Sequence, residues 1–96
     1  MSGLPVPPPV RQEETIAGPV LYPNPTTGEI NLVLDRTPQQ PLLLLVYNAL
    51  GAVVWQGEIS QSAARIDLSG QPRGVYMVRW QLQGQAAEAR RVVLAR

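Results

Sequence analysis

The chain has 96 residues, and its 45% apolar and 16% charged content is typical of one small folded domain. It contains no cysteine and no histidine, which excludes a disulfide framework, a thiolate metal site and a histidine base. All eight basic residues are arginine, and seven acids leave a net charge of +1. This balance argues against nucleic acid as a partner.

Residues 1–19 are predicted to be a proline-rich linker, and their composition predicts that it is disordered. Pro5, Pro7, Pro8 and Pro9 favour polyproline II, an extended conformation without internal hydrogen bonds. A proline-rich recognition peptide is the alternative. The segment lacks the basic start and apolar run of a secretory signal, and no run in the chain approaches the ~20 apolar residues of a membrane-spanning helix.

Residues 20–96 are predicted to form short β-strands separated by turns. Alternation of apolar and polar residues marks half-buried strands at 29–34, 64–68 and 75–82. Residues 42–47 are apolar on both faces, which favours an interior strand. A buried helix is the competitor, but six residues between Pro41 and the turn at 48–51 are too few. Further strands are expected at 20–22, 52–59 and 85–95.

The last strand is expected to form a hairpin with 75–82. Turns at intervals of about 8–12 residues then predict an all-β fold, an immunoglobulin-like β-sandwich of about seven antiparallel strands. The exposed strand edges of such a small sandwich make a homodimer one option.

The sequence offers no visible catalytic machinery. Its serines have no histidine to activate them, and there is no G-x-S-x-G motif. Five carboxylates alternate with apolar residues and indicate a solvated sheet face: Glu29, Asp35, Glu58, Asp67 and Glu88. A paired-carboxylate hydrolase is the alternative, but a sandwich this small offers little room for a cleft. We therefore predict no enzyme, no cofactor and no metal site.

The two tryptophans are the residues that a sugar-binding module would use as flat platforms. Trp80 shares its alternation phase with Tyr76 and Val78, which favours the core. Trp55 cannot be phased, because Val53 and Val54 fit both registers. An exposed Trp55 would support the alternative function, a carbohydrate-binding or adhesion accessory module of a secreted enzyme.

Four motifs follow one another in residues 20–96. The first is Tyr22-Pro23-Asn24-Pro25-Thr26-Thr27-Gly28, and the second is the strand and turn ending at Gly51. The third contains Ile66-Asp67-Leu68-Ser69 followed by Gly74-Val75-Tyr76, and the fourth begins with Arg90-Arg91 and ends at Arg96. In order and spacing they resemble the C-terminal sorting domain of the type IX, or Por, secretion system, type A. Asn48 stands where that family often has aspartate.

The motif residues also have physical roles. Pro23 and Pro25 are expected to hold the chain around Asn24 extended. Gly28, Gly51 and Gly74 permit backbone angles that side chains forbid, and Tyr76 is expected to fill the core while its hydroxyl finds a backbone partner.

The basic residues at the C-terminal end have two interpretations. Arg90, Arg91 and Arg96 place three of the eight arginines in the last seven residues. Charge of this kind protects an edge strand from aggregation. The alternative is a contact surface for an acidic partner or a receptor channel.

The resemblance implies a function. It implies a signal that directs an attached upstream cargo, such as a secreted hydrolase, from the periplasm through the outer membrane. The partners it implies are an outer-membrane translocon and a sortase-like peptidase, which would cut in the linker before Val20. The destination it implies is the outer-membrane surface or the extracellular space.

Overall fold

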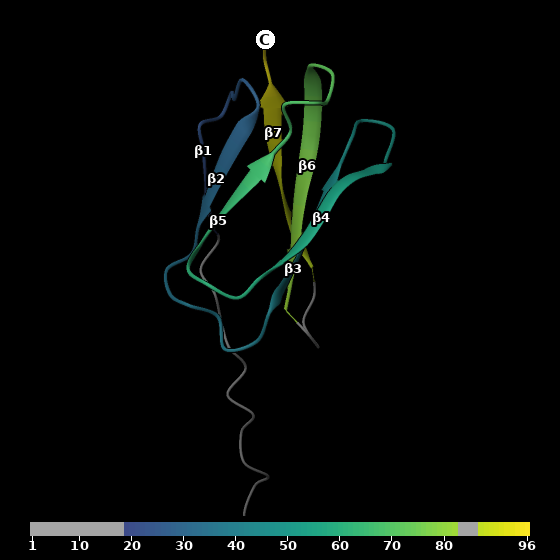
Figure 1. Ribbon diagram of the computed structural model, residues 1–96. Coiled ribbons are helices and arrows are strands. Elements are labelled where there is room, and N and C mark those ends of the chain that lie inside the picture. Colours follow the sequence, from purple (N-terminus) through teal and green to yellow (C-terminus); the bar gives the residue numbers. More distant parts are fainter. Residues whose placement is uncertain (1–18, 83–86) are drawn as a thin grey trace, which may run out of the picture.

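A computed structural model describes residues 19–82 and 87–96, and within these ranges the fold is all-β (Figure 1). Apart from Pro19, which is buried, the expected linker lies outside the described residues. The seven predicted strands are confirmed: two have the predicted bounds, and four have ends that differ by one residue. The last, predicted at 85–95, covers 88–94, and residues 85–86 lie outside the described residues. They are β1 (Val20–Tyr22), β2 (Glu29–Val33), β3 (Leu42–Tyr47), β4 (Val53–Ile59), β5 (Ala63–Asp67), β6 (Gly74–Gln81) and β7 (Glu88–Leu94).

The strands form two antiparallel sheets, in the orders β1-β2-β5 and β4-β3-β6-β7. The expected hairpin between β6 and β7 is present, and β3 lies inside its sheet between β4 and β6. In the constant type of immunoglobulin domain the fourth strand pairs with the fifth. Here β4 instead pairs with β3, because the two are joined by a short hairpin.

The core lies between the two sheets, where the predicted alternation places its apolar residues. Ile30 and Leu32 of β2 are buried, as are Tyr76, Val78 and Trp80 of β6. Trp80 is therefore a core residue, as predicted. Fully burying one large apolar side chain contributes about 1.5–3 kcal/mol, so this shared core holds the two sheets together.

The turn between β3 and β4 is organised by the side chain of Asn48. Its Oδ1 accepts hydrogen bonds from the backbone N–H groups of Leu50 and Ala52, both at 3.0 Å. Gly51 in this turn has φ +85°, a left-handed conformation that glycine adopts without a Cβ clash. An aspartate carboxylate at position 48 would supply the same acceptor for both N–H groups.

Candidate functional site

The loop between β1 and β2 is hydrogen-bonded along the outer edge of β7. The side-chain amide of Asn24 donates from Nδ2 to the Arg91 carbonyl (3.1 Å) and accepts at Oδ1 from the Val93 N–H (3.0 Å). An N–H can only donate, so the Val93 contact fixes which way the amide points. The amide thus substitutes for one residue of a neighbouring strand.

Thr26 continues this pairing through its backbone. Its N–H donates to the Val93 carbonyl at 2.9 Å, and its carbonyl accepts from the Ala95 N–H at 2.8 Å. An unpaired strand edge exposes backbone donors and acceptors that invite pairing with other chains. Asn24 and Thr26 together satisfy these groups at Arg91, Val93 and Ala95. We refer to these two residues and the β7 edge they contact as the edge clamp.

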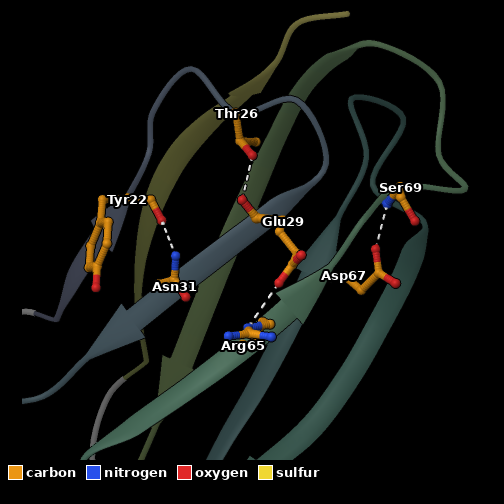
Figure 2. Close-up of polar contacts among 7 residues, drawn as sticks. All are labelled: Tyr22, Thr26, Glu29, Asn31, Arg65, Asp67 and Ser69. Carbon is orange, nitrogen blue, oxygen red and sulfur yellow. Dashed lines mark hydrogen bonds and ion pairs between the residues drawn. The ribbon is translucent and has the colours of Figure 1, made fainter.

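The edge clamp is held in shape by the hydroxyl of Thr26, which Figure 2 shows directed toward the backbone of β2. Thr26 is 1% exposed; Oγ1 donates to the Glu29 carbonyl (2.5 Å) and accepts from the Gly28 N–H (3.1 Å). A buried hydroxyl without hydrogen-bond partners would destabilise the fold, and here the Thr26 hydroxyl both donates and accepts a hydrogen bond. Sequence reasoning missed Thr26; a threonine two residues before a turn glycine was the available signal.

The loop between β5 and β6 joins the same end of the molecule. Gly28 accepts a hydrogen bond from the Leu68 N–H at 2.8 Å, and a Cβ added to Gly28 would lie 3.3 Å from Ser69. From the C-terminal end, Arg96 Nη2 reaches the Leu68 carbonyl at 3.5 Å. The first, third and fourth sequence motifs therefore meet at one end of the sandwich.

The three C-terminal arginines have different surroundings. Arg90 donates to the carbonyl of Pro19, and its guanidinium carbon lies 5.7 Å from the centre of the Trp80 ring, within cation–π range. Arg91 lies opposite Met77 on the outer face of the larger sheet. Strand β7 is an edge strand, and Arg90 and Arg96 bind neighbouring backbone carbonyls.

The remaining motif residues take up positions in the turns and the core. Tyr22 lies exposed on the outer face of the smaller sheet, where its carbonyl accepts from Asn31 Nδ2 at 3.4 Å (Figure 2). Pro23 and Pro25 are exposed, and the peptide bonds before them are cis. Tyr76 is buried, and its hydroxyl donates to the Pro72 carbonyl at 2.5 Å, as predicted.

The glycines of the motifs lie in the turns at this end or at the start of a strand. Gly51 lies in the hairpin between β3 and β4, and Gly74 begins β6. Like Gly28, both have positive φ, which agrees with the prediction that they permit unusual backbone angles.

The family described as secretion system C-terminal sorting domain matches residues 20–95. The chain belongs to this family. It is a C-terminal sorting domain of type IX secretion, as its four motifs predict. A search of curated proteins finds no match to the chain.

Family membership implies a function for this domain. A type IX sorting domain is a C-terminal secretion signal, so it implies an attached cargo and a secretion machinery that reads the signal. It also implies a secreted protein that passes to the outer membrane or the extracellular space. Within residues 19–82 and 87–96, no helix is long and apolar enough to cross a membrane.

The acidic residues of the sorting domain are spread over its surface. Glu29 forms an ion pair with Arg65, its Oε1 lying 2.9 Å from Nε, and both side chains are more than half exposed (Figure 2). Among the described residues no three acidic side chains come together as a candidate metal site. Two hydrogen bonds from Ser69 favour the charged form of the Asp67 carboxyl and hold its pKa below the ordinary 3.8. The bond from the Ser69 hydroxyl has the larger effect and the bond from its N–H the smaller.

Trp55 lies at the edge of the core on the inner side of β4. It is half-buried, pairs with Val46, and its ring covers Gly57, where an added Cβ would lie 2.8 Å from the indole. The register shift between Val46 and Tyr47 leaves Val54 as an extra residue, which is why alternation could not phase Trp55. The role of Trp55 as a sugar platform stays a prediction.

Proposed function

We propose that residues 20–96 are recognised as a folded unit by an outer-membrane translocon, which carries the attached protein from the periplasm to the cell surface. The observation that carries this proposal is the family match over residues 20–95. The structure supports it because the edge clamp connects the first motif to the last. Recognition of the C-terminal strand would thus require that the whole domain has folded.

The proposal assigns the domain no chemistry of its own. A sortase-like peptidase would cut the chain before Val20 and attach the cargo, for which a secreted hydrolase is one candidate, to the cell surface. Pro19 is buried and its carbonyl accepts from Arg90, so the cleavage point would lie on the N-terminal side of Pro19. The exposed motif residues, which the translocon would contact, include Tyr22, Pro23, Pro25 and Arg91.

A reporter fusion tests this function. Residues 20–96 are joined to the C-terminus of a fluorescent protein that carries an export signal, in a host with a working type IX system. We expect the reporter to become accessible to protease added outside the cells. Deletion of Val92–Arg96 removes part of β7, including the Val93 and Ala95 backbone groups that pair with Asn24 and Thr26. This deletion should leave the reporter in the periplasm.

Two controls separate sorting from general damage. The same fusion in a host that lacks the translocon should also stay in the periplasm. An Arg65→Gln variant, which breaks an exposed ion pair on the opposite sheet, should be secreted normally. Retention of the intact fusion in the competent host would show that these residues are not a sufficient signal.

A further inference from the structure

The outer face of the larger sheet carries apolar side chains that no other described element covers. Leu43 is 41% exposed, Val53 47%, Val75 41% and Met77 37%. Strand β3 is apolar on both faces, which is the pattern of a strand covered on both sides. One side of β3 faces the core, so the composition of the other side indicates a second covering layer.

An open hollow of about 530 Å³ lies on this face, toward the turn between β3 and β4. It is lined by Tyr47, Asn48, Val75, Met77, Arg79 and Ala89 among others. Arg79 Nη1 lies 3.4 Å from the Tyr47 hydroxyl, so a cation borders the hollow. Arg91 lies beside it, opposite Met77. Within residues 19–82 and 87–96, neither arginine forms an ion pair. The face therefore suits an occupant that is apolar and carries carboxylates.

We propose that residues 5–14 of this chain occupy the hollow. The apolar run Pro5-Val6-Pro7-Pro8-Pro9-Val10 covers the exposed apolar side chains, and Glu13 and Glu14 pair with Arg79 and Arg91. Proline-rich segments bind apolar surfaces that contain aromatic residues, because polyproline II loses little conformational entropy on binding. Tyr47 supplies the aromatic ring here.

The point at which this segment joins the domain makes the contact geometrically feasible. Pro19 is held by Arg90, whose side chain lies on the core side of the edge strand β7. The neighbouring Ala89 faces the opposite way and lines the hollow, so the segment reaches the outer face by passing the edge of β7. Glu14 precedes Pro19 by five residues, which span up to about 17 Å when extended. Adjacent strands are about 4.8 Å apart, so Arg91 on β7 and Arg79 on β6 lie within reach.

The size of the face favours a tethered occupant over a second copy of the chain. Four strands of six to eight residues cover roughly 19 by 24 Å, or about 450 Å². A stable interface buries about 800 Å² on each partner. A segment of the same chain needs less area because its effective concentration is in the millimolar range.

Docking of residues 5–14 has a consequence that rests on the proposed function. The segment before Val20 would be held against the sheet, so a peptidase would cut it more slowly until a partner displaces it. The docking itself does not depend on secretion and can be tested in purified protein.

The composition of the chain allows a direct measurement of docking. The chain has two methionines, Met1 and Met77, and no cysteine. In the full chain, Leu4→Cys carries a nitroxide spin label, and labelling with ¹³C-methyl methionine makes the Met77 signal observable by NMR. Docking brings the spin label close to the hollow, so we expect strong paramagnetic broadening of Met77.

Charge reversal supplies the decisive comparison. Glu13→Arg with Glu14→Arg replaces two ion pairs by repulsion, which should lower the docked-to-free ratio at least about fivefold and sharpen Met77. Salt at about 1 M, where the Debye length is about 3 Å, should act in the same direction. Arg65→Glu, a charge reversal on the opposite sheet, should leave the broadening unchanged.

Two results would overturn the proposal. One is equal broadening of Met77 in the parent chain and in the Glu13→Arg, Glu14→Arg variant. The other is broadening between chains, seen when spin-labelled protein without ¹³C is mixed with ¹³C-labelled protein without a spin label, because the occupant would then be a second copy. Either result leaves the sorting function untouched.

Discussion

Replacement of Asn24 by alanine removes the two side-chain hydrogen bonds of the edge clamp, to Arg91 and Val93. A hydrogen bond contributes about 0.5–1.5 kcal/mol net. Because Asn24 is exposed, water can replace the amide, and the lower half of that range applies. We therefore expect the free energy of unfolding to fall by about 1–2 kcal/mol. In a domain of 60–100 residues this lowers Tm by about 4–16 °C.

Urea unfolding followed by tryptophan fluorescence measures this loss, with a lower midpoint at an unchanged m-value. Amide hydrogen exchange gives the local readout, because the Val93 N–H loses its acceptor and should exchange faster. Asn24→Asp separates the two bonds. It keeps the acceptor for Val93 and replaces the donor to Arg91 with a second acceptor, so Val93 should stay protected while the domain is destabilised.

Asn31→Ala is the matched control, since it removes the same group from the smaller sheet, where the amide makes one long bond of 3.4 Å. Its effect should stay within about 0.5 kcal/mol. The reasoning is refuted if Asn24→Ala unfolds at the parent urea concentration and its Val93 amide keeps the parent exchange rate. The clamp would then contribute nothing to holding β7.

Three further outcomes can be checked on the same protein. Tyr76→Phe leaves a carbonyl without its hydroxyl donor and should cost about 1 kcal/mol in urea unfolding. Gly51→Ala forces a side chain into φ +85° and should cost about 1–2 kcal/mol, whereas thermal unfolding of Gly70→Ala, at an open site without positive φ, should show almost no change. The lowered pKa of Asp67 stabilises the fold above pH 3.8, because the unfolded chain binds the proton first as the pH falls. That contribution is lost as the pH falls through the folded pKa, so acid titration of Asp67→Asn should show a flatter stability curve below pH 3.8.

The strands could be predicted from sequence because each buries one face. In β2 and β6 the alternation of Ile30 with Leu32 and of Tyr76 with Val78 marks the inner face directly. Alternation could not place Trp55, because the register shift opposite Tyr47 adds one residue to β4 and so changes which face its later residues occupy. Such a shift depends on the pairing of two strands, which periodicity along one strand does not report.

The candidate site divides in the same way. The motif containing Asn24 and the terminal arginines could be found by their spacing, and they were sufficient to indicate the family. Their contacts could not be found, because Asn24 and Val93 are 69 positions apart and nothing local links an amide to a distant strand edge. Thr26 went unnoticed for the same reason, since a buried hydroxyl is recognisable only once the loop has closed around it.

The sequence alone determined that this protein carries no cysteine or histidine chemistry, that its apolar residues form short strands, and that its motifs are those of a sorting domain. The tertiary structure decided that the first of these motifs lies along the last strand and that Arg90 binds the backbone of Pro19. The physical reason is that alternation and turn residues act between near neighbours in the chain. The hydrogen bonds that join the two ends arise only when packing brings those ends together.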